Sequence, residues 1–290
     1  KPGEHFLPAK ILNEVYNSKV THLHFVPSVF DLFLNYLEGH RDECSRFNSV
    51  KHVFLSGEAL SASLIKRFYE LFGFDNVRLH NLYGPTECAV DVTYYDCIPD
   101  DVDPVPIGKP ISNTQLYVVD KYMNLLPVGV KGELCIGGVN VGQGYLNNEE
   151  LTAEKFVDNP FGEGKLYKTG DLAYFREDGE VIFCGRIDSQ IKLNGQRIEI
   201  SEIEAVISSI SQVESAAVVV NKLRSPEMLV AFYCSAKDIT QEIREVCLRK
   251  LPGYMVPATF ERLDKMPLNQ SGKLDRKQLD TISQMVNALL

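Results

Sequence analysis

The sequence contains no tryptophan, no CxxC pair and no surplus of basic residues: 30 lysines and arginines stand against 39 aspartates and glutamates, a net charge of -9. This acidic balance argues against a nucleic-acid-binding protein, because basic side chains are what neutralise phosphates. No apolar run reaches the roughly 18 residues of a membrane-spanning helix, so we expect no membrane partner either. The seven cysteines are dispersed and odd in number, which predicts no zinc site and fits a reducing cytoplasm best.

Two further patterns are missing. The chain begins at Lys1 without an initiator methionine or a signal-peptide pattern, and we expect a segment of a longer or processed chain located in the cytoplasm. The stretch 162–165 ends like a phosphate-binding Walker A loop, but Leu166 stands where that motif needs a serine or threonine. This stretch is therefore not a Walker-type phosphate site.

The length of 290 residues and the apolar content of 44% fit about two globular domains. Up to about residue 90, strand and helix patterns alternate, and this rhythm predicts a largely parallel sheet with helices packed on it. Ser61 is the expected N-cap of one of these helices. The expected helices are 11–16, 29–37 and 61–72, and the expected strands are 22–26, 50–55 and 77–82.

After about residue 90 the pattern changes to short strands between Gly, Pro and Asn turns, which is typical of a β-rich part with a barrel-like or meandering course. A third pattern begins near Arg186 and predicts a compact α+β module. Ser201 and Glu204 form an expected capping box for its first helix, and helices are also expected at 239–250 and after Pro267. The expected strands are 90–95, 114–119, 132–136, 166–168, 180–183, 216–220 and 229–234.

Several polar segments combine groups that bind nucleotides. Residues 81–87 end a strand at the edge where parallel sheets bind ligands, and they offer an aromatic ring, a hydroxyl and a carboxylate. Residues 167–171 end in Asp171, whose carboxylate can accept both hydroxyls of a ribose. Residues 269–273 put Lys273 on a polar loop, where an ammonium is a point charge for phosphate or carboxylate. Taken singly, each segment also fits an ordinary turn or a surface lysine.

In this order, these segments resemble core motifs of nonribosomal peptide synthetase adenylation domains. With the glycine-rich stretch 132–146 and the stretches 185–199 and 251–257, six successive motifs are matched, and the resemblance covers essentially the whole chain. Such domains belong to the adenylate-forming superfamily, with acyl-CoA synthetases and luciferases. The resemblance implies activation of an amino acid with Mg-ATP as an aminoacyl adenylate, release of pyrophosphate, and transfer to the phosphopantetheine thiol of a carrier protein.

The fold implied by the resemblance is α/β. Residues 1–187 are expected to form the C-terminal portion of the large adenylation core, with the parallel sheet in 1–90 and a β-barrel-like part in 91–187. Residues 188–290 are expected to form the small, mobile α+β C-terminal domain.

Two of the family's motifs are absent from the chain. They are the glycine-rich phosphate loop and the motif carrying the aspartate that binds the substrate ammonium, and both are expected upstream of residue 1. No carrier attachment site of the Leu-Gly-Gly-x-Ser type occurs. We therefore expect the missing N-terminal part of the core and a separate carrier domain as partners, which leaves open whether this chain acts alone.

The resemblance assigns nucleotide-binding roles residue by residue. Tyr83 and Phe183 match adenine-contacting positions; the family often has tyrosine where this chain has Phe183, but a phenylalanine ring can still stack. Thr86 resembles the contact to the α-phosphate, and Glu87 resembles the Mg²⁺ ligand. The ribose ligands are expected at Asp171 and Arg186, and further nucleotide-binding positions at Gly57 and Asn81.

The resemblance also assigns roles in the C-terminal part. Lys273 matches the catalytic lysine, which offsets charge as the substrate carboxylate attacks the α-phosphate, and it joins Thr86 and Glu87 as the expected catalytic set. Asp188 matches the hinge about which the small domain turns. The thiolation face, which the family presents to the carrier-bound thiol, is expected at Lys192 and Gly195.

The substrate pocket of the family corresponds here to a set that is partly polar. Buried polar side chains need hydrogen-bond partners, and a substrate hydroxyl supplies one. The set resembles the signature of serine-activating domains, in particular the serine module of enterobactin-type synthetases, so serine is the expected substrate. Ornithine is the alternative, because Asp91 could pair with its side-chain ammonium. The pocket residues are His24, Phe54, Ser56, Leu82, Val90 and Asp91.

Two other interpretations stay open at this point. The chain could belong to another ligase of the same superfamily, such as an acyl- or aryl-CoA synthetase. It could also be a non-catalytic fragment that pairs with a partner chain, in which case an apolar patch on residues 1–90 should be exposed.

Overall fold

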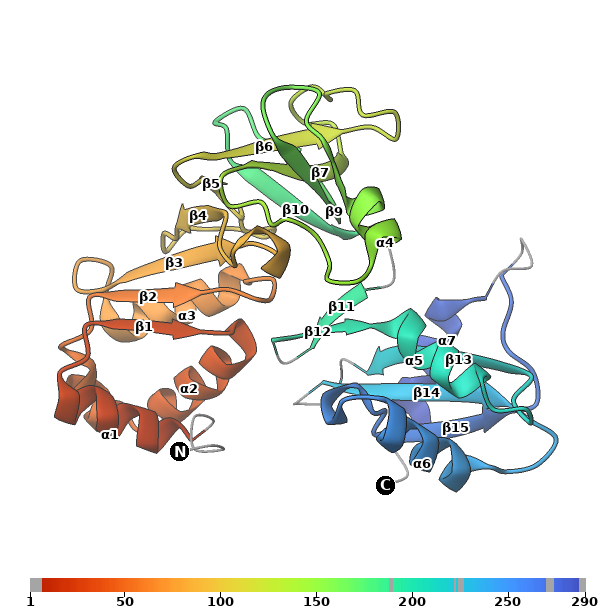
Figure 1. Cartoon of the computed structure of the whole chain (residues 1–290). Coiled ribbons are helices and arrows are strands. Elements are labelled where there is room, and N and C mark those ends of the chain that lie inside the picture. The colour runs from red at the N-terminus through yellow and green to blue at the C-terminus, as the bar shows by residue number, and fades with distance from the viewer. Residues whose placement is uncertain are drawn as a thin grey trace. The chain divides into compact units, whose positions relative to one another are not determined.

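The computed structural model describes residues 7–187, 190–193, 195–221, 223, 227–269 and 274–286. The chain divides into two compact units, Lys1–Asp188 and Ser189–Leu290. Figure 1 shows the elements of both units, which are taken here one at a time.

The first unit begins with the predicted parallel sheet. Strands β1, β2 and β3 are parallel and lie side by side in chain order, and they are connected through helices α2 and α3. Strands β4 and β5 then extend the same sheet in antiparallel fashion. The bounds are α1 Pro8–Ser18, β1 His22–Phe25, α2 Pro27–Gly39, η2 Arg41–Phe47, β2 His52–Leu55, α3 Ala62–Phe72, β3 Arg78–Tyr83, β4 Thr93–Asp96 and β5 Lys109–Pro110.

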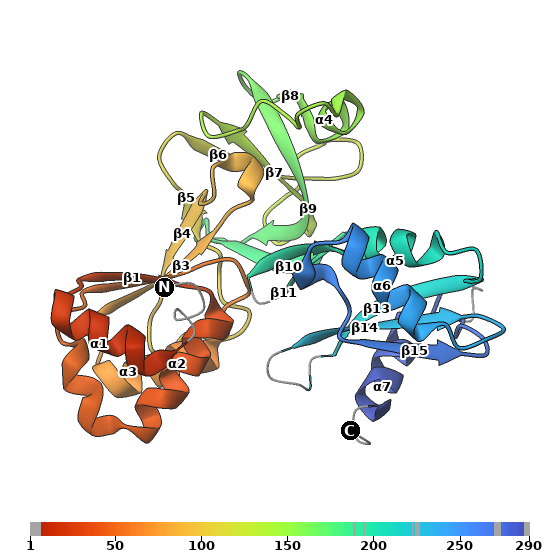
Figure 2. The same ribbon diagram turned by 60° about the horizontal axis from the view of Figure 1, so that its bottom comes forward.

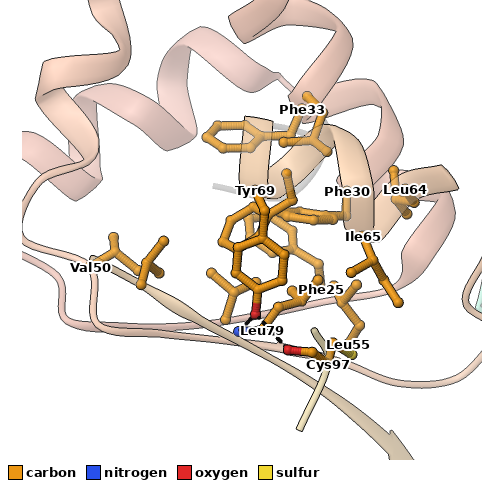
Figure 3. Close-up of a cluster of buried hydrophobic side chains, with 14 of the residues drawn as sticks. Phe25, Phe30, Phe33, Val50, Leu55, Leu64, Ile65, Tyr69, Leu79 and Cys97 are labelled. Carbon is orange, nitrogen blue, oxygen red and sulfur yellow. Dashed lines mark hydrogen bonds between the residues drawn. The ribbon is translucent and has the colours of Figure 1, made fainter. Parts of the chain in front are cut away.

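Helices α1, α2 and α3 cover one face of this sheet with an aromatic-rich core (Figure 3). Tyr69 is buried there, and its hydroxyl donates to the Cys97 carbonyl (2.9 Å) and accepts from the Leu79 N–H (3.1 Å). Burial raises the pKa of Tyr69 to about 12, and the hydrogen bond from the Leu79 N–H opposes this shift only in part. The predicted N-cap is confirmed, since the Ser61 Oγ accepts from the Leu64 N–H (3.3 Å).

The β-rich part is an open antiparallel sheet. Its strands run in the order β10-β9-β7-β6, with β8 paired to β9, so the expected barrel-like closure is not found among the described residues. Helix α4 was not predicted; the Asn148 side chain caps it by accepting from the Leu151 N–H (3.1 Å). The bounds are β6 Thr114–Val119, β7 Gly132–Gly138, α4 Glu149–Lys155, β8 Phe156–Asp158, β9 Lys165–Phe175 and β10 Val181–Arg186.

One predicted strand, 90–95, is wrong in its first half. Ala89 and Val90 have φ of 58° and 78°, in the left-handed region, and they form a turn instead. Strand β4 begins only at Thr93, whose buried hydroxyl donates to the Ile107 carbonyl (2.5 Å). The residues expected in the pocket at the start of that strand therefore lie on a turn.

The second unit is a small α+β module. Strands β13 and β14 are antiparallel, and β15 joins β14 in parallel. Alternate side chains of these strands pack on α5 and α6 on one face and on α7 on the other (Figure 2). A separate hairpin, β11 and β12, precedes them. The bounds are β11 Gln190–Leu193, β12 Gln196–Glu199, α5 Ile200–Ser208, β13 Ser215–Asn221, β14 Met228–Cys234, α6 Thr240–Lys250, η4 Gly253–Met255, β15 Thr259–Leu263 and α7 Arg276–Val286.

The predicted capping box on α5 is wrong. Helix α5 begins after Glu199 without a side-chain cap. Glu204 instead accepts from the Val218 N–H (2.8 Å) and from the Arg276 guanidinium (2.9 Å), so it connects α5 to β13 and α7. Glu204, which the local sequence predicted to cap the helix, thus makes tertiary contacts instead. Across the ranges that the structure covers, no helix has both the length and the apolar character needed to cross a bilayer.

Candidate functional site

The strongest grouping of predicted site residues lies where β3, β9 and β10 meet. The phenol of Tyr83, at the end of β3, donates to Asp171 Oδ2. The guanidinium of Arg186 donates to Asp171 Oδ1 (2.6 Å), because β9 and β10 pair these two residues in register. Tyr83 and Asp171 are only 8% and 6% exposed. The structure therefore brings together three residues that are far apart in the sequence.

The local backbone explains how Asp171 reaches this position. The pairing of β7 with β9 shifts register between Glu133 and Cys135, and such a bulge redirects the side chains of the longer strand. Within it, Thr169 Oγ1 donates to the Leu134 carbonyl (2.6 Å) and accepts from the Asp171 N–H (2.9 Å). Arg186 adds a second bond, to the Thr169 carbonyl (3.1 Å). Sequence reasoning did not assign Thr169, although it directly precedes the Gly-Asp pair.

The electrostatics of this cluster keep the Tyr83 phenol protonated. Burial, followed by the adjacent Asp171 charge, raises the pKa of Tyr83 well above its ordinary value, so the phenol stays a hydrogen-bond donor. A carboxylate has about four acceptor positions. Tyr83 and Arg186 each bond a different oxygen of Asp171, and each carboxylate oxygen can accept more than one hydrogen bond.

Two aromatic rings accompany the carboxylate. The ring centroids of Tyr83 and Phe183 lie 6.4 Å apart at an interplanar angle of 35°. Phe183 is on β10, opposite Ala173 of β9. Aromatic faces of this kind can stack a nucleobase. The four residues predicted to contact adenosine are thus neighbours in the folded chain.

The short helix η3, Thr86–Cys88, follows Tyr83 after a tight turn. A Cβ at Gly84 would lie 2.1 Å from the Val90 carbonyl oxygen, so only glycine fits there. Thr86 is exposed and Glu87 is half-buried. The turn thereby presents a hydroxyl and a carboxylate next to the aromatic and carboxylate cluster at the end of β3.

The donor set at η3 fits one kind of metal. Among the described residues, no three His, Cys, Asp or Glu side chains are grouped so that they could hold an ion by themselves. Mg²⁺ does not need such a cage, because it keeps several waters and is bound by one or two carboxylates together with substrate phosphates. A single carboxylate such as Glu87 fits that arrangement, and it does not fit a structural zinc site.

The predicted pocket residues fall into two groups. His24 and Phe54 are register partners on β1 and β2, and their side chains lie on the face of the sheet opposite the helices. His24 Nε2 and Ser56 Oγ share a hydrogen bond of 2.7 Å. Leu82 of β3 is half-buried and alternates with buried neighbours, which puts it on the same face. Val90 and Asp91 lie on the turn before β4.

The remaining predicted positions are placed as follows. Gly57 directly follows Ser56 with φ of 91°, a conformation that favours glycine. Asn81 is buried, and its amide donates to the Pro106 carbonyl (2.8 Å). Lys192 is exposed on β11, and Gly195 forms the turn of the β11–β12 hairpin with φ of 75°. Asp188 and Lys273 lie outside the described residues.

Glu180, just before β10, is a half-buried glutamate that sequence reasoning missed. Among the described residues its buried Oε2 atom has no hydrogen-bond partner, and Lys109 Nζ lies 3.7 Å from Oε1. Burial raises the pKa of Glu180, and the lysine opposes that shift only in part.

We expect a pH-dependent cost from Glu180. The folded state binds the proton of the Glu180 carboxyl group more tightly than the unfolded state does. The free energy of unfolding therefore falls as pH rises from the unfolded pKa through the higher folded pKa. The slope from one proton is at most about 1.4 kcal/mol per pH unit. Glu180→Gln should remove this fall, as measured by urea unfolding across that pH interval. Glu177→Gln, at an exposed glutamate, is the matched control; an equal change in both variants would refute the assignment to Glu180.

Comparison with known proteins identifies the class. The AMP-binding enzyme family matches residues 1–146, and the AMP-binding enzyme C-terminal domain matches residues 202–273. The chain therefore belongs to the AMP-binding enzymes, and the α/β fold expected for this class is confirmed by solved adenylation-domain structures. Within the class, the chain corresponds to the C-terminal part of a nonribosomal peptide synthetase adenylation domain.

Three similar proteins support this assignment. Zwittermicin A synthase ZmaJ of Bacillus cereus is 48% identical over 96% of this chain and 54% of its own length. Tyrocidine synthase 1 of Brevibacillus parabrevis is 44% identical over 81% of this chain and 22% of its own length. The structure of holo-PA1221, an NRPS protein containing adenylation and PCP domains, matches with a TM-score of 0.82 and 26% identity over 94% of this chain and 46% of that one. The chain thus spans about half or less of each of these relatives.

Proposed function

We propose that the protein containing this chain activates an amino acid with Mg-ATP as an aminoacyl adenylate and passes it to the phosphopantetheine thiol of a carrier protein. The observation that carries the proposal is the Tyr83–Asp171–Arg186 cluster beside Phe183. It combines two rings that can stack on adenine with a carboxylate, a group whose oxygens accept hydrogen bonds from ribose hydroxyls.

The turn after β3 supplies the phosphate side of this proposal. Thr86 has a hydroxyl to bond the α-phosphate, and Glu87 has the carboxylate that would hold Mg²⁺. When bound, Mg²⁺ neutralises charge that develops on the phosphates. Two further nucleotide-binding positions are proposed: Gly57, at a left-handed backbone position after β2, and Asn81 of β3, whose amide donates to the Pro106 carbonyl.

The C-terminal residues complete the proposed chemistry. Lys273 would offset charge while the substrate carboxylate attacks the α-phosphate and pyrophosphate leaves. Asp188 lies at the division between the two compact units, which supports its proposed role as a hinge between a large core, 1–187, and a small domain, 188–290. The exposed Lys192 and the Gly195 turn are the proposed face for the carrier-bound thiol. The PCP domain of the PA1221 relative supports a carrier partner.

The proposed amino acid is serine. His24 and Ser56 form a hydrogen-bonded pair beside Phe54, which supports a small polar pocket rather than an apolar one. A substrate hydroxyl would join such a pair and Asp91, whereas an analogue without the hydroxyl would leave polar groups without that partner. The first half of the adenylation core, which carries the phosphate loop in this family, is proposed as the partner that completes the site.

A coupling experiment tests this specificity. Asp91→Ala should lower kcat/KM for serine-dependent ATP–pyrophosphate exchange by roughly 10- to 100-fold, because a hydrogen bond to a charged group is lost. Exchange with alanine, which has no hydroxyl, should change by less than about threefold. Asp100→Ala, at an exposed neighbouring aspartate, is the control and should affect neither substrate. Equal losses with serine and alanine would refute Asp91 as the hydroxyl's partner, and a preference for ornithine in the parent protein would refute serine.

A further inference from the structure

The glycine-rich loop after β7 is bound to the turn that carries Glu87. The Gly142 N–H donates to the Glu87 carbonyl (2.8 Å), and the Asn140 side-chain amide donates to the Cys88 carbonyl (3.3 Å). A Cβ at Gly142 would lie 2.9 Å from the Glu87 carbonyl oxygen, so a larger residue would force the two segments apart. The loop therefore fixes the backbone of the turn.

The same loop reaches the side chain of Glu87. The Tyr145 hydroxyl donates to Glu87 Oε1 at 2.7 Å, across 58 residues of sequence. This is a direct bond to the carboxylate assigned to Mg²⁺. Neither the adenosine-binding residues nor the predicted pocket includes Tyr145, and the sequence analysis counted its loop among the matched motifs without giving Tyr145 a role.

The position of the Tyr145 ring is fixed from several sides. The ring packs edge-on against Phe156 at 5.4 Å, and Phe156 in turn packs on Tyr167 of β9. The Tyr145 N–H donates to Thr152 Oγ1 of α4 (2.9 Å). The preceding Gly144 has φ of 138°, and a Cβ there would lie 2.4 Å from a Thr152 methyl carbon. These contacts hold the ring and the backbone of Tyr145 in place while its hydroxyl bonds Glu87.

A tyrosine hydroxyl is a suitable hydrogen-bond donor to a carboxylate that binds a metal ion. A glutamate side chain has several rotatable bonds, and holding it in one geometry costs conformational entropy that a preformed hydrogen bond offsets. Arginine or lysine would also orient the carboxylate, but their positive charge would oppose a divalent cation. A neutral phenol orients the carboxylate and leaves its negative charge in place.

We propose that Tyr145 is a positioning residue for the Glu87 carboxylate, so that the loop 140–145 sets the affinity of the site for Mg²⁺ with its nucleotide. The inference rests on the proposed function, which makes Glu87 the Mg²⁺ ligand. It adds a residue and a structural element that act through Glu87 without touching the substrate.

The test is Tyr145→Phe in the intact protein that contains this chain. Phenylalanine keeps the ring packing on Phe156 and removes only the donor. We expect the Mg²⁺ concentration for half-maximal ATP–pyrophosphate exchange to rise about threefold to tenfold, with the KM for the amino acid unchanged. Mn²⁺ binding in the presence of an unreactive ATP analogue, followed by electron paramagnetic resonance, should weaken by the same factor. Tyr122→Phe, at a ring that is 72% exposed, is the control.

A double variant separates positioning from a general structural effect. In a Glu87→Gln background, Tyr145→Phe should cause no further loss of Mn²⁺ affinity, because the ligand it positions is gone. Additive losses, or a Tyr145→Phe protein that binds Mn²⁺ as tightly as the parent, would overturn the inference while leaving the proposed function intact. A parent protein without exchange for any amino acid would overturn the proposed function and the inference with it.

Discussion

Asp171→Ala is expected to have the largest effect of any single substitution in the Tyr83–Asp171–Arg186 cluster. The change removes the shared partner of Tyr83 and Arg186 and leaves the guanidinium, whose side chain is only 16% exposed, without its ion pair. Breaking a buried pair on one side costs about 3–5 kcal/mol, so urea unfolding should show a loss of that size. ATP–pyrophosphate exchange should fall by at least about 100-fold, because the proposed ribose contact is lost as well.

A milder variant separates folding from nucleotide binding. Asp171→Asn keeps a carbonyl oxygen to accept from the Tyr83 phenol and removes the charge, so its stability loss should be smaller while the KM for ATP still rises. Asp158→Ala is the control, since it breaks a pair of similar length with Lys165 (2.6 Å) on the protein surface. An exposed pair contributes less than about 1 kcal/mol. If Asp171→Asn bound ATP normally, Asp171 would not be a ribose ligand.

Glu87→Gln should give the second large effect, and this effect should be chemical rather than structural. Glutamine has a carbonyl oxygen that can still accept from the Tyr145 hydroxyl, so unfolding should change little. The negative charge that would hold Mg²⁺ is lost, and we expect exchange at saturating substrates to fall by about 100-fold or more. Higher Mg²⁺ should restore part of the activity.

Glu150→Gln, at an exposed glutamate in the first turn of α4, is the matched control for Glu87→Gln and should exchange normally. The dependence of exchange on Mg²⁺ concentration decides whether Glu87 acts through the metal. A Glu87→Gln protein with the parent's Mg²⁺ dependence would contradict the proposed metal role, even if its activity were low for another reason.

The strongly patterned elements were predictable from sequence. Helices α2 and α3 have apolar residues at helical spacing, and the short strands β1 to β3 alternate with these helices along the chain, which predicts a parallel sheet. The open β-rich sheet was harder to predict, because the alternation of apolar and polar residues along each strand does not say whether the edges of the sheet close into a barrel. Helix α4 and strand β8 were missed because each is short and lies within a polar stretch.

The candidate site was predictable in its residues but not in its contacts. The motifs named Tyr83, Asp171 and Arg186. Tyr83 and Asp171 are 88 positions apart, and their distance in space depends on how β3, β9 and β10 meet. Tyr145 could not be assigned at all, because its role depends on a glycine loop folding against η3. The serine assignment depends on the resemblance of six pocket positions.

The most direct test of the central claim is amino-acid-dependent ATP–pyrophosphate exchange by the intact protein, with serine, alanine, threonine, ornithine and phenylalanine compared at equal concentration. We predict that serine supports exchange at least about tenfold faster than any of the others, since a hydroxyl partner in a polar pocket contributes that much discrimination. Exchange driven by ornithine would keep the adenylation chemistry and reject serine. No exchange with any amino acid, by a protein whose fold and nucleotide binding are intact, would contradict the proposed function itself.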